Sequence, residues 1–138
     1  PGISITLNYD SNNLRNDSAA YERGKEILNS VPNGSVLLSL REYDVFPSWY
    51  IRYIERPNTD VAIIAVRLLQ FDWYINNIRN RFPNRIPELD SSDVTSAMQE
   101  IVRHNKNRTD VYFTFVHAVP GGEYRLKSMG KVWKAVLE

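Results

Sequence analysis

Hydrophobic and polar positions repeat along this chain with two periods, one typical of helices and one typical of strands. Apolar or small residues recur at helical spacing from Asn16 to about Val31, and Asn16 or Asp17 can cap the N-terminus of that helix. Pro32-Asn33-Gly34 then predicts a turn. The short apolar run from Ser35 to Leu40 predicts a strand that is buried on both faces.

The middle of the chain repeats this order of strand and helix. Asp44 can cap a second helix, whose first turn tolerates Pro47. Its inner stripe consists of Phe46, Trp49, Tyr50, Tyr53 and Ile54. The segment from Thr59 to Leu69 predicts a second buried strand. Asp72 then caps a third predicted helix, which Pro83 ends. Its inner positions are Trp73, Ile75, Ile78 and Phe82.

The C-terminal third predicts one more helix and the remaining strands. Ser91-Ser92-Asp93 introduces a helix to about His104, and the segment from Asp110 to His117 predicts a third strand. Pro120-Gly121-Gly122 predicts a turn, and the segment from Glu123 to Val136 predicts one or two closing strands around Gly130.

This alternation of helices and strands predicts an α/β fold. We expect a three-layer sandwich, Rossmann-like, with a mainly parallel sheet, helices on both faces, right-handed crossovers, and a closing antiparallel strand or hairpin at the C-terminus. The 138 residues are 43% hydrophobic and 24% charged, values typical of globular proteins. We therefore expect one domain over residues 1–138.

Charge and composition exclude several classes of protein. The formal net charge of +1 is too small for sequence-independent binding of nucleic acid. The chain has no cysteine, no apolar run long enough to span a membrane and no signal peptide. We expect a soluble segment excised from a larger protein, because the chain begins at Pro1 without methionine and ends in Leu137-Glu138, which is common after cloned inserts.

The central stretch resembles a segment of large bacterial multispanning membrane proteins related to the vertebrate transmembrane protein O-mannosyltransferase. The resemblance is carried by Phe46-Pro47-Ser48-Trp49-Tyr50, Thr59-Asp60-Val61 and Asp72-Trp73-Tyr74. Asn8-Tyr9, Val111-Tyr112-Phe113-Thr114 and Gly130 extend it over nearly the whole chain. Where that family has Gly-Asp-Asn-Asp, this chain has Arg41-Glu42-Tyr43-Asp44, which lacks the glycine.

The resemblance implies a domain on the extracytoplasmic face of a membrane, C-terminal to a bundle of transmembrane helices. Related enzymes are similar to glycosyltransferases that take a sugar from a polyprenol phosphate, with acidic residues in a membrane-proximal loop. That loop is not in this sequence. The resemblance therefore implies an accessory module that is catalytically silent on its own. Its partners would be the transmembrane part of its parent chain and a glycan or polypeptide acceptor.

A candidate ligand site follows from the strands themselves, because ligands of α/β sheets bind at the carboxyl ends of parallel strands. The predicted strand ends carry Arg41, Glu42, Asp44, Asp72, Trp73 and His117. Carboxylates beside an aromatic ring suit a sugar, whose hydroxyls form hydrogen bonds and whose apolar face stacks on the ring. No cofactor or metal is predicted, because two histidines without cysteine make a weak set of metal ligands.

Each of these residues also has a structural interpretation. Asp44 and Asp72 can cap helices, and Trp49, Tyr50, Trp73 and Tyr74 can pack against the sheet. Arg41 and Glu42 can form an ion pair in solvent. The alternative function is a small independent hydrolase or transferase that acts on a sugar, with Glu42, Asp44 and Asp72 as acid, base or metal ligands.

Overall fold

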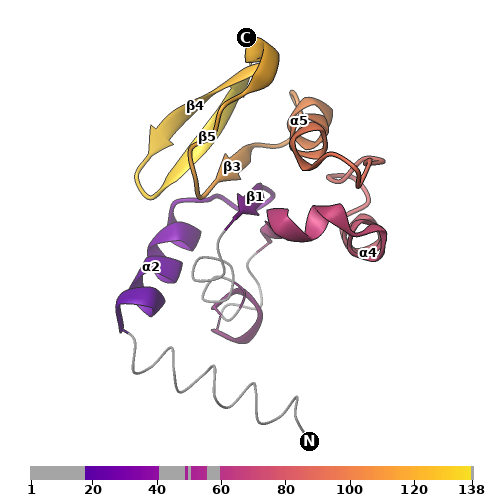
Figure 1. Cartoon of the computed structure of the whole chain (residues 1–138). Helices are drawn as coiled ribbons and strands as arrows, with labels where there is room; N and C mark the ends of the chain where they lie inside the picture. Colours follow the sequence, from indigo (N-terminus) through magenta and orange to yellow (C-terminus); the bar gives the residue numbers. More distant parts are fainter. Residues whose placement is uncertain (1–17, 41–48, 50, 56–59, 138) are drawn as a thin grey trace, which may run out of the picture.

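The computed structural model of the chain describes residues 18–40, 49, 51–55 and 60–137, which alternate between helices and strands (Figure 1). The helices are α2 (Ser18–Asn29), α4 (Asp72–Arg81) and α5 (Val94–His104). The strands are β1 (Val36–Ser39), β2 (Ala62–Ala65), β3 (Val111–Phe113), β4 (Tyr124–Met129) and β5 (Val132–Leu137). Shorter turns form a π-helix, η1 (Ile51–Glu55), and two 3-10 helices, η2 (Val66–Gln70) and η3 (Pro120–Gly122). None of the helices in this part of the chain is long and apolar enough to cross a bilayer.

The strands form one mixed sheet in the order β2-β1-β3-β5-β4. β1 pairs in parallel with β2 on one side and with β3 on the other, so that Leu37 lies between Ile63 and Tyr112. β5 pairs antiparallel with β3 and with β4, which closes the sheet with a C-terminal hairpin. The sheet therefore has the predicted parallel core and the predicted antiparallel hairpin.

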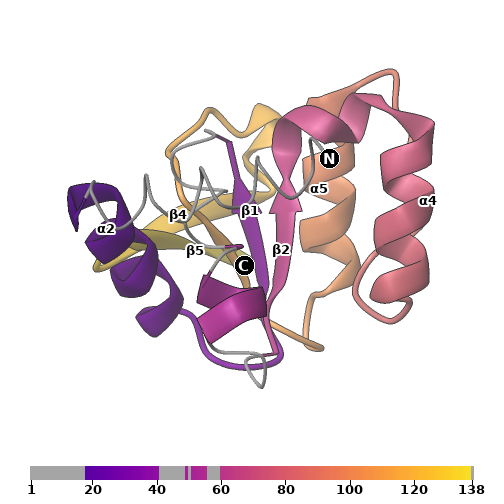
Figure 2. The same cartoon turned by 90° about the horizontal axis from the view of Figure 1, so that it is seen from below.

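Helices cover both faces of the parallel strands, with α2 on one side and α4 and α5 on the other (Figure 2). Successive strand residues point to opposite faces of a sheet. Leu37 accordingly packs in the cluster that contains Ile27 and Leu28 of α2, whereas Leu38 packs with residues of α4 and α5. This confirms the three-layer α/β architecture.

Two strands are shorter than their sequence patterns predict. The segment predicted as one strand from Thr59 to Leu69 is β2 followed by η2, in which Val66 and Leu69 are both buried. Residues three apart lie on the same side of a 3-10 helix, so an apolar run can pack on the core without extended backbone. The third predicted strand ends at Phe113, and the rings of Phe115 and His117 pack on the Phe113 ring at centroid distances of 5.5 and 4.5 Å.

Local signals set the remaining elements. The predicted helix after Ser91-Ser92-Asp93 is α5, and Asp93 is its N-cap, whose carboxylate accepts hydrogen bonds from the backbone N–H groups of Thr95 and Ser96. Gly130 makes the β4–β5 turn with a φ of 81°, a value that favours glycine. The predicted second helix lies largely outside the described residues, including Asp44, Phe46 and Tyr50, and only η1 and Trp49 of it are described.

Candidate functional site

The six predicted ligand residues fall into three groups. Arg41, Glu42 and Asp44 lie outside the described residues. Asp72 and Trp73 begin α4, which follows β2 and η2, whereas His117 follows β3. β1 lies between β2 and β3, and neighbouring strands are about 4.8 Å apart. The strand order therefore places His117 on the other side of β1 from Asp72 and Trp73.

Asp72 does not cap α4, although the sequence predicted it as the cap. The N-cap is Phe71, whose backbone is extended and whose carbonyl accepts hydrogen bonds from the N–H groups of Tyr74 and Ile75. η2 ends at Gln70, so Phe71 alone separates it from α4, and Asp72 lies in the first helical turn with its side chain exposed. A carboxylate in the first turn interacts favourably with the helix dipole, so Asp72 still favours the start of α4.

Trp73 is exposed, and the prediction that it packs against the sheet is wrong. Its exposed fraction is 62%, whereas the next residue, Tyr74, is buried. The Tyr74 hydroxyl accepts a hydrogen bond from the backbone N–H of Ala65 at 2.9 Å. With Tyr74, Ile75 and Ile78 on the buried face of α4, the period of the helix turns Trp73 outward.

Trp73 borders a largely apolar groove of about 420 Å³, which we call the α4 groove. Its walls come from α4, η2, β2 and Trp49, and β2 is the edge strand of the sheet at this side. The groove is lined by Trp49, Ile63, Leu68, Trp73, Tyr74, Asn77, Ile78, Arg81 and Phe82. Trp73, Asn77 and Arg81 are spaced four residues apart, so the indole, an amide and a guanidinium lie along one face of the helix.

Neighbouring rings support the indole at the rim of this groove. The ring of Phe71, which is itself 41% exposed, stacks on Trp73 with centroids 5.9 Å apart, and Tyr74 meets Trp73 edge to face at 5.8 Å. The Arg81 guanidinium lies over the Phe82 ring at 5.7 Å. The sequence motif Asp72-Trp73-Tyr74 therefore divides into a first-turn acid, an exposed ring and a buried ring.

His117 joins the end of β3 to the C-terminal hairpin. Its Nε2 lies 2.7 Å from the Tyr124 hydroxyl, and its ring lies 4.5 Å from Phe113 and 5.0 Å from Phe115. Burial lowers the pKa of His117, an effect that the Phe115 backbone partly offsets. Burial and then the Glu123 charge raise the pKa of Tyr124 to about 12. The lowered pKa of His117 and the raised pKa of Tyr124 both favour the neutral side chains. The neutral imidazole and the neutral phenol can therefore share a hydrogen bond that stabilises the junction of β3 and the hairpin.

Sequence patterns did not predict the hydroxyl pair at the ends of β1 and β3. Ser39 and Thr114 are both buried, and the Thr114 hydroxyl donates to the Ser39 hydroxyl at 3.3 Å. Only the pairing of β1 with β3 brings these residues together across 75 positions of sequence. Within residues 18–40, 49, 51–55 and 60–137, no three His, Cys, Asp or Glu side chains are grouped as a metal site would require.

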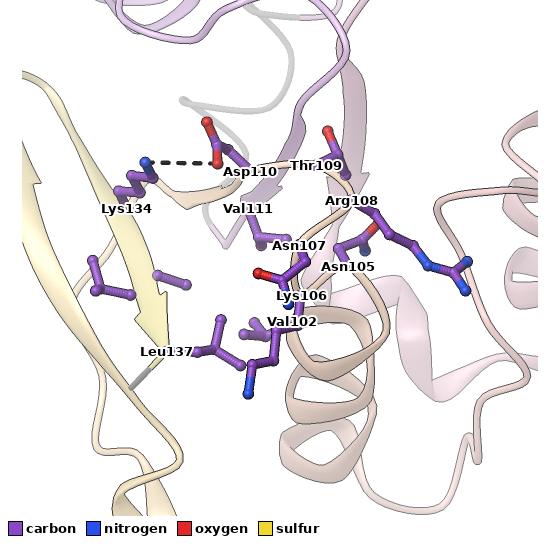
Figure 3. A pocket seen from close by; sticks show the side chains of 12 residues that line it. Val102, Asn105, Lys106, Asn107, Arg108, Thr109, Asp110, Val111, Lys134 and Leu137 are labelled. Carbon is purple, nitrogen blue, oxygen red and sulfur yellow. Dashed lines mark ion pairs between the residues drawn. The ribbon is translucent and has the colours of Figure 1, made fainter.

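A second hollow, of about 320 Å³, lies between the end of α5 and β5 (Figure 3). Lys134 approaches Asp110 at 3.6 Å on one side of it, and the Arg108 guanidinium points away from the hairpin on the other. Asn105 is buried here, and its amide N–H groups donate to the carbonyls of Arg85 and Ile101 at 2.9 and 2.7 Å. These contacts tie the end of α5 to the neighbouring loop and indicate a structural role for this hollow.

Comparison with known proteins identifies a family. The model of the family described as TMEM260-associated domain 2 matches residues 20–133 of this chain. No curated protein and no solved structure matches the chain. The family match includes α4, the whole lining of the α4 groove and most of the hairpin, but not residues 134–137, which line the second hollow.

Proposed function

The chain belongs to the TMEM260-associated domain 2 family, and from this premise we propose that it is a noncatalytic binding module of a glycosyltransferase-like membrane protein. The module would lie on the extracytoplasmic face, beside the transmembrane part of its parent chain. Its ligand would be a saccharide carried by the acceptor, and its binding surface would be the α4 groove.

The observation that carries this proposal is the exposure of Trp73 beside the groove. An indole that is 62% exposed, and that rests on the Phe71 ring, offers a flat apolar platform to the apolar face of a pyranose. Ligand sites combine apolar walls with a few polar groups that fix orientation. Asn77 and Arg81 provide such groups four and eight residues further along α4.

Contacts among the described residues give less support to a carboxylate-dependent hydrolase or transferase. That function would need Asp72 to act together with Glu42 and Asp44, which lie outside the described residues. Asp72 is exposed in the first turn of α4, where its carboxylate interacts with the helix dipole. The aromatic groove is therefore the better-supported site, and saccharide binding is the better-supported function.

Titration of the chain with a panel of neutral mono- and disaccharides, followed by amide NMR shifts, tests this function. We expect shifts confined to Trp73, Asn77 and their neighbours around the groove. Trp73→Ala and Asn77→Ala should each weaken binding about tenfold or more, because each removes a contact made by the ligand.

Asn76→Ala is the matched control, since Asn76 is an exposed asparagine of the same helix that does not line the groove. It should bind as the unmodified chain does. Absence of shifts with every saccharide, or equal weakening by Asn76→Ala and Asn77→Ala, would contradict a saccharide site in the α4 groove.

A further inference from the structure

The C-terminal hairpin has a charge that differs from that of the rest of the chain. Residues 124–137 contain four basic residues, Arg125, Lys127, Lys131 and Lys134, and no acidic residue. Elsewhere in the chain, 16 acidic residues outnumber 13 basic ones. The net charge of +1 is therefore the sum of a positive charge on the hairpin and a smaller negative charge on the rest of the chain.

The strand register gathers most of this charge on one face of the hairpin. Lys127 lies directly opposite Lys134, and Arg125 lies on the same face two residues before Lys127. Directly opposed like charges destabilise a pair of strands unless an anion lies against them. β4 is the last strand in the sheet order, and Figure 1 shows it at the outer side of the molecule. Arg125 and Lys127 are both exposed there.

Two of the lysines form only weak pairs with neighbouring carboxylates. Lys131 approaches Glu26 at 3.5 Å, and Lys134 approaches Asp110 at 3.6 Å. All four of these side chains are exposed by a third or more, and ion pairs in such positions contribute little free energy. The positive potential of the hairpin is therefore available to an external anionic surface.

An apolar side chain lies at the tip of the hairpin, between two of the lysines. Met129 is 39% exposed and is the last residue of β4 before the turn at Gly130. Lys127 precedes it by two residues and Lys131 follows it by two. A flexible apolar side chain flanked by cations matches a lipid interface, in which anionic headgroups overlie hydrocarbon.

We propose that the β4–β5 hairpin binds the surface of a membrane that contains anionic phospholipids. Arg125, Lys127, Lys131 and Lys134 contact the headgroup phosphates, and Met129 enters the interface. This surface is at the opposite end of the sheet from the α4 groove, so lipid contact and ligand binding use separate parts of the module. The apolar Met129 side chain among the cations favours a membrane, in which hydrocarbon lies beneath the phosphates, over an acidic protein, whose carboxylates would pair with the cations alone.

Co-sedimentation of the full 138-residue chain with lipid vesicles tests this proposal. We expect binding to phosphatidylcholine vesicles that contain about one third phosphatidylglycerol, and none to pure phosphatidylcholine. Added salt should weaken the binding. Each basic residue near an anionic surface strengthens binding about fivefold, so the double variant Lys127→Gln/Lys134→Gln should weaken it roughly 25-fold. This double variant also relieves the repulsion between the two lysines, so it should remain folded.

The double variant Arg67→Gln/Arg79→Gln is the control, because it removes the same charge from η2 and α4, near the opposite edge of the sheet. It should bind anionic vesicles within about twofold of the unmodified chain. Equal losses in the two double variants would overturn the proposal, since net charge and not the hairpin would then govern binding. Equal binding to both kinds of vesicle, or binding to neither, would also overturn it.

Discussion

His117 shows how the surroundings of one residue change what its sequence position suggests. It follows a strand end, where ligands of α/β sheets bind, yet its ring lies among Phe113, Phe115 and Tyr124. Burial lowers its pKa below the ordinary value of 6.5. Protonation therefore favours the unfolded chain, in which the imidazole is in water.

We predict that the stability contributed by His117 is complete above its unfolded pKa of 6.5 and declines as the pH falls through that value toward the lower folded pKa. Chemical denaturation at about pH 7.5 and about pH 5.5 measures the change. His117→Gln, which cannot titrate, should remove most of it, and His104→Gln should not. The pKa values of Asp90 and Asp93 are lowered from 3.8 by hydrogen bonds from Ser92 and Ser96, so these carboxylates remain charged throughout this window. An unchanged pH dependence in His117→Gln would rule out this assignment.

At the scale of elements, α4 and α5 differ in how they begin. Each has an aspartate near its start in the sequence: Asp72 was predicted as a cap, and Asp93 ends the Ser91-Ser92-Asp93 segment that was predicted to introduce α5. Asp93 accepts backbone hydrogen bonds from Thr95 and Ser96, whereas α4 has no side-chain cap and Asp72 lies one position further along. The two aspartates therefore allow capping to be compared with a dipole interaction within one protein.

We predict that Asp93→Ala lowers the melting temperature by about 3–5 °C, because two N–H groups at the start of α5 lose their acceptor. Asp72→Ala should lower it by no more than about 1–2 °C, since only the interaction with the helix dipole is lost. Thermal unfolding followed by circular dichroism measures both values. A larger loss for Asp72→Ala than for Asp93→Ala would contradict the helix starts described here.

At the scale of the whole molecule, the parallel strands of the sheet are covered on both faces. Leu37 and Leu38 are adjacent in β1 and fully buried, yet they belong to different clusters. β1 is also paired on both sides, so its side chains are shielded by helices and its backbone by neighbouring strands. We therefore expect β1 to be the most protected strand in hydrogen exchange.

We predict that Leu37→Ala and Leu38→Ala each lower the free energy of unfolding by about 2–5 kcal/mol, because each opens a cavity on its own face of the sheet. Val116→Ala, at a position with 63% exposure, should change it by less than about 0.5 kcal/mol. Urea denaturation compares the three variants. A small effect of either leucine variant would show that one face of the sheet is open in solution.

Local patterns were sufficient to predict much of this fold. The Asp93 cap, the turn at Pro32-Asn33-Gly34 and the hairpin around Gly130 depend on side-chain chemistry and backbone preferences that act within a few residues. The alternation of strands and helices predicted a three-layer sheet, because apolar strands need cover on both faces. The sequence therefore determined the order of the main helices and strands and the fold class.

Tertiary structure decided where elements end and which side chains remain exposed. An apolar run such as 59–69 is compatible with either a strand or a 3-10 helix. Packing on the core decided that its second half forms the 3-10 helix η2. In the same way, the packing of Tyr74, Ile75 and Ile78 turned Trp73 outward. Strand order, which depends on contacts far apart in sequence, separated His117 from Asp72 and set Ser39 against Thr114. These outcomes depend on long-range burial and pairing, which no local pattern of residues encodes.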